Sequence, residues 1–221
     1  PRCIGKHWGP KPNAEIRTLL HKDNLFKHLR NQGVLVGMAN AYPPAFFRGV
    51  ESGRRALSSI QFAVTSAGVK LSTESDLRRG RAFAADFTGE SWRSELGFED
   101  TPILTPEEAG QGLARAARDY GLLLFDHWIT DVIGHRGSMD EAILLLENLD
   151  EVLGGILNTW HDDEGLVLIA SDHGNLEDKS TRRHTHSPVP VLIMGKGHQK
   201  VAANITDISD ISPALLSYLR R

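Results

Sequence analysis

The 221-residue sequence predicts an α/β protein: a largely parallel sheet sandwiched by helices, with a small inserted cap. Two observations support this class. Short apolar runs, such as residues 122–125 and 166–170, are continuous instead of alternating, which is typical of strands buried on both faces. These runs alternate with longer segments in which apolar residues recur at helical spacing. Strand–helix–strand alternation of this kind indicates parallel pairing.

The N-terminal part begins with a predicted loop, because residues 1–12 contain three prolines and little apolar periodicity. Residues 13–30 predict one helix, which Gly33 follows as a helix breaker. A short buried strand is expected at residues 34–38, and the Pro-Pro pair that ends residues 40–44 predicts a turn.

Residues 45–105 predict a small cap inserted into a core that residues 1–44 and 106–221 would form. Within this cap, periodicity favours a helix at about residues 58–67. Its basic patch, Arg78, Arg79 and Arg81, could bind an anionic substrate, although a solvated basic surface is the default interpretation.

The second half begins with clear helix signals. Thr105 is a predicted N-cap, with Pro106 in the first helical position and two acidic residues after it, and the helix should end at about Asp119. A strand at residues 122–128 follows. Ser138 and Glu141 then form a predicted capping box.

The helix that Ser138 opens has one broad apolar face, whose predicted members are Ile143, Leu146, Leu149, Leu153, Ile156 and Leu157. The pair Gly154-Gly155 inside it costs about 1–2 kcal/mol of helix propensity, which burial must offset. Strands at residues 166–170 and 189–194 and a closing helix at 211–219 complete the prediction.

Composition excludes several classes of function. A net charge of −3 and a pI of 6.4 offer no electrostatic case for nucleic acid or an anionic membrane as a partner. No run approaches the roughly 18 apolar residues of a membrane helix, and no signal-peptide pattern opens the chain. The single cysteine, Cys3, cannot form an internal disulfide, which fits a reducing compartment. We therefore expect a cytoplasmic protein.

Three short clusters of carboxylate and imidazole side chains lie beside predicted strand ends. They are Asp131 with His135, Asp172 with His173, and His184. Open α/β sheets bind ligands at the carboxyl ends of their strands, so these clusters predict a metal centre. Taken alone, Asp131 could be a helix-cap residue and Asp172 an ordinary turn residue. Asp126 and His127 are expected to make structural hydrogen bonds.

The three motifs resemble a known family. Thr-Asp-Val-Ile-Gly-His at 130–135, Asp-His-Gly-Asn at 172–175 and His-Thr-His-Ser-Pro-Val-Pro at 184–190 are similar, in order and spacing, to the C-terminal half of the alkaline phosphatase superfamily. The branch they most resemble contains cofactor-independent phosphoglycerate mutase and phosphopentomutase. The resemblance is strong from about Leu122 onward, weaker over the first forty residues and poor between.

The resemblance implies two divalent ions. Asp131, His135 and His184 would hold one ion, and Asp172 and His173 would contribute to the other. In the family, an earlier Asp-Gly strand end and a Ser or Thr nucleophile complete the second site. No Asp-Gly pair occurs in these 221 residues, so we expect an N-terminally truncated chain whose nucleophile lies outside it. Mixed Asp/His ligation suits Zn²⁺ or Mn²⁺ better than Ca²⁺, and the sequence does not choose between the two.

Two histidines compete for one ligand position. The family's ligand stands four residues before the Pro of Pro-Val-Pro, which selects His184 over His186. The preceding Arg182 and Arg183 could bind a substrate phosphate, although exposed loop arginines are usually only solvated.

The predicted function is a metal-dependent phosphoryl-transfer enzyme, of phosphomutase or phosphomonoesterase type, that acts on a small phosphorylated substrate. The alternative is a non-catalytic metal-binding domain, or a fragment that another polypeptide completes.

Overall fold

The computed structural model describes residues 10–220, so Cys3 and most of the predicted N-terminal loop lie outside the described residues. The chain divides into two compact units. One contains the described residues up to Ala82 together with Tyr120–Phe125, and the other contains Phe83–Asp119 and the residues from Asp126 onward. This division does not follow the predicted boundaries, and a cap at residues 45–105 on a core of 1–44 and 106–221 remains a prediction.

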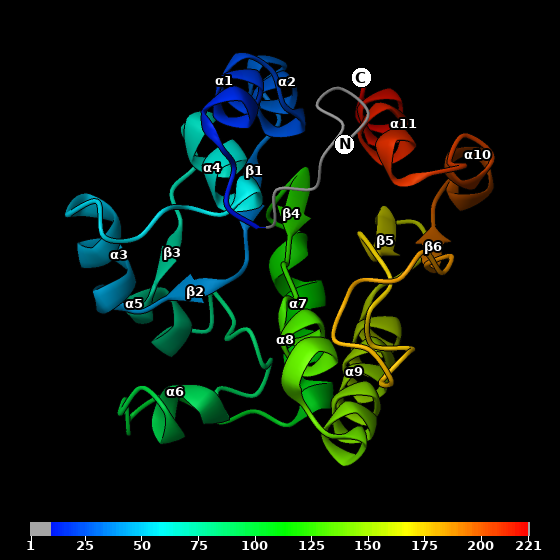
Figure 1. The fold of residues 1–221 in the computed structure, drawn as a ribbon. Helices are drawn as coiled ribbons and strands as arrows, with labels where there is room; N and C mark the ends of the chain where they lie inside the picture. Colours follow the sequence, from blue (N-terminus) through cyan, green and yellow to red (C-terminus); the bar gives the residue numbers. More distant parts are fainter. Residues whose placement is uncertain (1–9, 221) are drawn as a thin grey trace. The chain divides into compact units, whose positions relative to one another are not determined.

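The first unit combines short helices with two parallel strand pairs (Figure 1). Its elements are α1 (Ala14–Lys22), α2 (Leu25–Asn31), β1 (Val36–Met38), β2 (Ala41–Tyr42), α3 (Pro44–Glu51), α4 (Ser59–Ser66), β3 (Ser72–Thr73), α5 (Glu74–Arg78) and β4 (Leu122–Leu124). β1 pairs with β4, and β2 pairs with β3. Leu29 and Val64 are fully buried in this unit.

Two predictions for this unit were wrong. The single helix expected at residues 13–30 is two helices, because the backbone at Asp23 is extended and the Asn24 side chain accepts a hydrogen bond from the Lys27 N–H at 3.0 Å, which starts a new helix. The turn expected at residues 40–44 contains β2 and the start of α3. Pro44 occupies the first turn of α3, where a missing N–H costs nothing.

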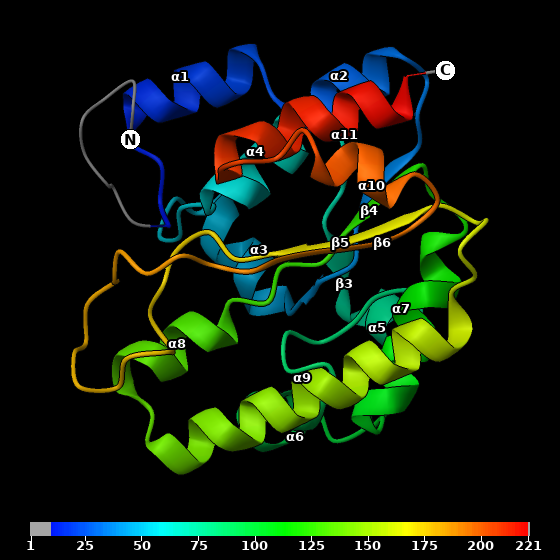
Figure 2. The ribbon, with the colours of Figure 1, turned by 90° about the vertical axis from the view of Figure 1, so that its right-hand side faces the viewer.

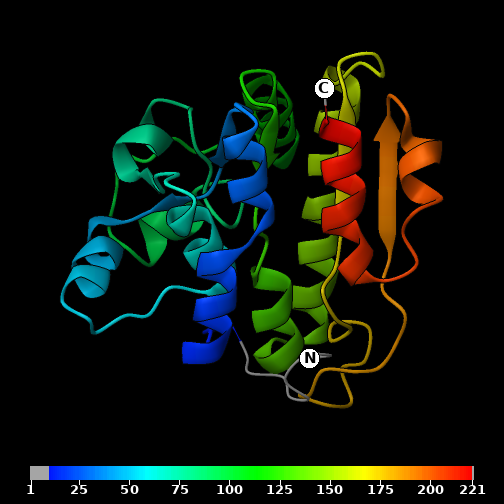
Figure 3. The same cartoon turned by 90° about the horizontal axis from the view of Figure 1, so that it is seen from above.

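The second unit contains most of the predicted second half. Its elements are α6 (Glu90–Ser94), α7 (Pro106–Ala117), α8 (Ile129–Arg136), α9 (Met139–Thr159), β5 (Leu166–Ala170), β6 (Val191–Gly195), α10 (His198–Ala202), η1 (Ile208–Asp210) and α11 (Ile211–Leu219). α7 packs along α9 (Figure 2), and α10 lies against β6 (Figure 3). The helices of the described residues include none that is long and apolar enough to cross a membrane.

The strand pairing is mixed, whereas the sequence predicted a largely parallel sheet. Within the described residues, β1–β4 and β2–β3 are parallel, but β5 and β6 run antiparallel from Leu166↔Gly195 to Ala170↔Val191. Parallel neighbours need a crossover, usually a helix. The described residues 171–190 contain no helix and instead fold back through an antiparallel bridge between Gly174 and Thr185. The protein is thus α/β in content, and one larger sandwiched sheet remains a prediction.

The interface of α7 and α9 explains one glycine of the Gly-Gly pair. A Cβ atom on Gly155 would overlap the Glu107 carbonyl oxygen of α7. Conversely, a Cβ atom on Gly110 of α7 would overlap the Val152 carbonyl oxygen of α9. The two helices therefore approach each other at a distance that only glycine permits. Among the described residues, no atom lies within 4 Å of a Cβ built on Gly154.

The buried face of α9 differs from the predicted one. Ala142, Leu145 and Val152 are buried there with Gly155. Three members of the predicted apolar face are instead exposed: Ile143, Leu146 and Leu157. The prediction failed because apolar residues surround much of this helix, so periodicity alone could not choose the side that α7 covers.

Candidate metal centre

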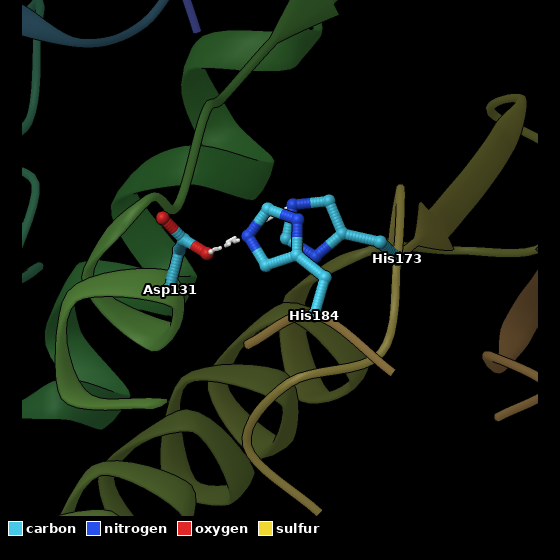
Figure 4. A group of neighbouring side chains, drawn as sticks. All are labelled: Asp131, His173 and His184. Carbon is cyan, nitrogen blue, oxygen red and sulfur yellow. Dashed lines mark hydrogen bonds and ion pairs between the residues drawn. The ribbon is translucent and has the colours of Figure 1, made fainter. Parts of the chain in front are cut away.

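Three ligand-capable side chains from separate segments meet in the second unit (Figure 4). Asp131 lies on α8, and His173 and His184 lie in the loop between β5 and β6. One donor atom from each lies within 4.8 Å of the others. Asp131 Oδ1 is 3.1 Å from His184 Nε2 and 3.8 Å from His173 Nε2. One carboxylate oxygen and two imidazole nitrogens therefore converge.

The two other predicted site residues adjoin this group. His135 follows Asp131 by one helical turn, and its Nε2 lies 3.3 Å from Asp131 Oδ1 and 3.1 Å from His184 Nε2. Asp172 Oδ2 lies 3.5 Å from His173 Nε2, with 75% of its side chain exposed. The structure therefore brings all five predicted residues together, and their roles as ligands remain a prediction.

The sequence predicted a strand as far as Trp128, but β4 ends at Leu124 and α8 begins at Ile129.

The loop between β5 and β6 forms hydrogen bonds with α8, the helix that carries Asp131 and His135. The Lys179 ammonium donates to the carbonyl oxygen of Ile133 at 2.5 Å, within α8. His135 Nδ1 lies 2.6 Å from the carbonyl oxygen of Arg182, in the same loop. A donor to a backbone carbonyl fixes which ring nitrogen of His135 remains available to a metal.

Asn175 is a site residue that the sequence analysis missed. It is buried, and its side-chain amide donates to Asp131 Oδ1 at 2.9 Å. A Cβ atom on Gly134 would lie 2.5 Å from Asn175 Cγ, so any other residue at this position of α8 would displace the Asn175 amide. The Asp-His-Gly-Asn motif contained the signal, since a buried amide next to ligand candidates is a common way to orient a carboxylate.

The two loop histidines form a stacked pair with ring centroids 3.5 Å apart. Burial lowers the pKa of His184, and the neighbouring His173 lowers it further. The nearby Asp131 acts in the opposite direction and favours the protonated form. The net effect favours the neutral imidazole, which is the form that binds a metal ion.

The remaining predicted residues lie around this group. His186, Arg182 and Arg183 are exposed, and Arg182 contributes its backbone carbonyl to His135. His127 has an interior position, where its Nδ1 lies 3.1 Å from the Ala85 carbonyl oxygen and burial lowers its pKa. Burial also raises the pKa of Asp126, and the negative charge of Asp172 adds to this effect.

The basic patch of the first unit is largely paired. Arg78 contacts Glu74 at 2.6 Å, and Arg81 contacts Asp76 at 2.8 Å. These two guanidinium groups are therefore engaged within their own segment, which agrees with the default interpretation of a solvated basic surface.

Comparison with known proteins gives a consistent family. The model of the Metalloenzyme superfamily matches residues 105–220, slightly more than half of the chain. A 2,3-bisphosphoglycerate-independent phosphoglycerate mutase from Acaryochloris marina is 33% identical over 138 residues, which are 55% of this chain and 26% of that protein. The enzyme of the same name from Thiobacillus denitrificans is 34% identical over 128 residues, 54% of this chain and 25% of the relative. The matched region thus spans about a quarter of the length of these curated relatives. No solved structure matches the chain.

Proposed function

The chain belongs to the Metalloenzyme superfamily, and on that basis we propose that it carries the metal-binding part of a phosphoryl-transfer enzyme. The enzyme would be a phosphomutase or a phosphomonoesterase acting on a small phosphorylated substrate. The observation that carries this proposal is the convergence of Asp131, His173 and His184, with His135 and Asp172 beside them. Curated relatives named as phosphoglycerate mutases support the phosphomutase type.

The five side chains would serve two ions. In this proposal Asp131, His135 and His184 hold the first ion, and Asp172 and His173 contribute to the second. The donor set fits Zn²⁺ or Mn²⁺, because carboxylate oxygens are mixed with imidazole nitrogens, whereas Ca²⁺ prefers oxygen ligands alone. Divalent ions bound here would polarise a phosphoryl oxygen and stabilise the negative charge that develops during transfer.

The surrounding side chains would orient the donors and the substrate. The Asn175 amide holds Asp131 Oδ1, and the Arg182 carbonyl oxygen holds the His135 ring. Arg182 and Arg183 directly precede His184 in the sequence, and both residues are exposed. We propose that their guanidinium groups bind the substrate phosphate.

A second candidate is a non-catalytic metal-binding domain, or a fragment that another polypeptide completes. An encoded segment upstream of Pro1 with an Asp-Gly strand end and a Ser or Thr loop would favour the enzyme over this candidate. The two candidates share the metal site and differ in the oxygen nucleophile.

Metal content and phosphate-ester turnover together test the proposal. The purified chain should retain Zn²⁺ or Mn²⁺ after dialysis, as measured by mass spectrometry, and a chelator should remove the ions. Turnover of p-nitrophenyl phosphate should reach trace level at most, because the covalent route needs a nucleophile. A chain that binds neither metal would refute the proposal. Rapid turnover with a trapped phosphorylated residue would place the nucleophile within the chain, and Thr130 and Ser171 would be tested first.

A further inference from the structure

The separation of His173 and His184 depends on a loop without helical support. These residues belong to opposite halves of the described segment 171–190, which contains no helix. The halves meet at one backbone bridge, in which the Thr185 N–H donates to the Gly174 carbonyl oxygen at 2.9 Å. Besides this bridge, the stacked rings and their contacts with Asp131 join the halves, and further side-chain hydrogen bonds between them would restrict the two histidines more.

Glu177 provides such a side-chain connection. Its Oε2 accepts a hydrogen bond from the Asn175 N–H at 2.6 Å, in the first half of the loop. Its Oε1 accepts a hydrogen bond from the Thr185 hydroxyl, in the second half, next to His184. These donors, with the Thr185 hydroxyl as the largest cause, lower the pKa of Glu177 to about 2. We call these two hydrogen bonds the Glu177 bridge.

The residue opposite the bridge is independently constrained. A Cβ atom on Gly174 would lie 2.5 Å from Glu177 Oε1 and would overlap the Thr185 hydroxyl. Any other residue at Gly174 would therefore displace both partners of the bridge. Glycine at this position thus leaves the space that the Glu177 and Thr185 side chains occupy.

The bridge also reaches the third member of the group. Asn175, whose N–H Glu177 holds, donates its side-chain amide to Asp131 Oδ1 at 2.9 Å. One carboxylate is thus hydrogen-bonded to the residue next to His184 and to the residue that orients Asp131. Both oxygens of Glu177 accept hydrogen bonds from the loop, so this carboxylate is engaged within the loop.

We propose that Glu177 is a positioning residue of the metal centre, and that its bridge sets the placement of His173 and His184 relative to Asp131. The proposal deepens the proposed function and rests on it for the identity of the site. In this proposal Glu177 affects metal affinity indirectly, through the positions of the two histidines. A hydrogen-bonded carboxylate of the same unit that does not contact this loop should have no such effect.

The test uses the full chain and four single variants. Glu177→Gln keeps the size of the side chain and removes its charge, while Thr185→Val removes the hydroxyl and Thr185→Ser retains it. Glu164→Gln is the matched control, because Glu164 is also a hydrogen-bonded carboxylate of this unit, paired with Arg118 at 2.9 Å. Each variant is titrated with Co²⁺, whose visible spectrum reports ligand geometry, and hydrogen exchange of residues 171–190 is measured in the metal-free chain.

We expect Glu177→Gln and Thr185→Val each to weaken Co²⁺ binding by about 10-fold or more, to change the cobalt spectrum and to accelerate exchange in the loop. Thr185→Ser and Glu164→Gln should remain close to the unsubstituted chain. The double variant Glu177→Gln/Thr185→Val should bind Co²⁺ no more weakly than the single variant of lower affinity. Both changes disrupt the same Glu177 bridge, so their effects should not add.

Two results would overturn the inference while leaving the proposed function intact. Faster exchange with unchanged cobalt affinity would limit Glu177 to a structural role, and unchanged exchange would show that the bridge does not hold the loop. If the unsubstituted chain binds no Co²⁺, Zn²⁺ or Mn²⁺, the proposed function fails, and the positioning role fails with it. Exchange in the metal-free chain still shows in that case whether the bridge orders the loop.

Discussion

A single methyl group added at Gly155 should separate α7 and α9, while the same methyl group at Gly154 should not. Both substitutions to alanine gain about 1 kcal/mol of helix propensity. At Gly155 the new Cβ atom would overlap the Glu107 carbonyl oxygen and lie 3.0 Å from the Gln111 backbone nitrogen. Backbone atoms cannot rotate away as a side chain could, so the helices must move apart. Overpacking of this kind costs about 1–3 kcal/mol.

The comparison of the two variants isolates the steric cost, because the propensity gain is common to both. We expect the free energy of unfolding of Gly155→Ala to lie about 1–3 kcal/mol below that of Gly154→Ala. Urea unfolding followed by circular dichroism at 222 nm measures this difference, and the slopes should remain equal if only the folded state changes. Equal stability of Gly155→Ala and Gly154→Ala would show that the helices have room for the methyl group and would contradict this prediction.

Three further predictions concern the metal centre. His184→Ala should weaken Zn²⁺ binding by about 100-fold, since losing one of the three proposed protein ligands of the first ion costs about 3 kcal/mol of binding free energy. Substitution of the exposed His186 by Ala should change the affinity little, and the reverse order in competition titrations would identify His186 as the ligand. The pKa of Glu177 falls from 4.5 to about 2 on folding, so its stabilising contribution is complete above pH 4.5 and is lost as the pH falls towards 2. Urea midpoints of Glu177→Gln and the unsubstituted chain should therefore differ near pH 6 and converge near pH 2, and a constant difference would contradict this. The pKa of His184 lies below 6.5 in the metal-free chain, so the free energy of unfolding should decrease as the pH falls through 6.5 towards that lower value. Titration of the ring by NMR with a pKa at or above 6.5 would contradict this.

The sequence predicted best where structure depends on neighbouring residues. Thr105 and Ser138 each form the expected N-cap, and each accepts a hydrogen bond from the N–H three residues later. The strand at 166–170 and the helix at 211–219 have the predicted limits. Caps and short apolar runs are local features, so a single sequence contains the information they need.

Prediction failed where two local signals conflicted, or where the structure depends on residues distant in the sequence. The capping amide of Asn24 interrupts a run of apolar residues whose spacing favoured one continuous helix. The antiparallel direction of β6 depends on the path of the whole loop from 171 to 190 and not on the composition of either strand. The need for glycine at position 155 follows from the packing of α7, because the Glu107 carbonyl oxygen of α7 excludes a side chain there.

The metal centre shows both kinds of information in one place. The donor types and the four-residue spacing of Asp131 and His135 are local, and together with the family resemblance of the three motifs they predicted which side chains would meet. The helix that places them was missed, because α8 has only 8 residues, contains Gly134 and begins without a side-chain cap. A helix this short is marginal alone, so its position must come from contacts elsewhere. The described contacts that position it include its packing against α9 and two hydrogen bonds from the loop between β5 and β6, from Lys179 to the carbonyl oxygen of Ile133 and from Asn175 to Asp131. The loop therefore supplies donors to the site and also holds the helix that supplies the others, which is why its internal order should control metal affinity.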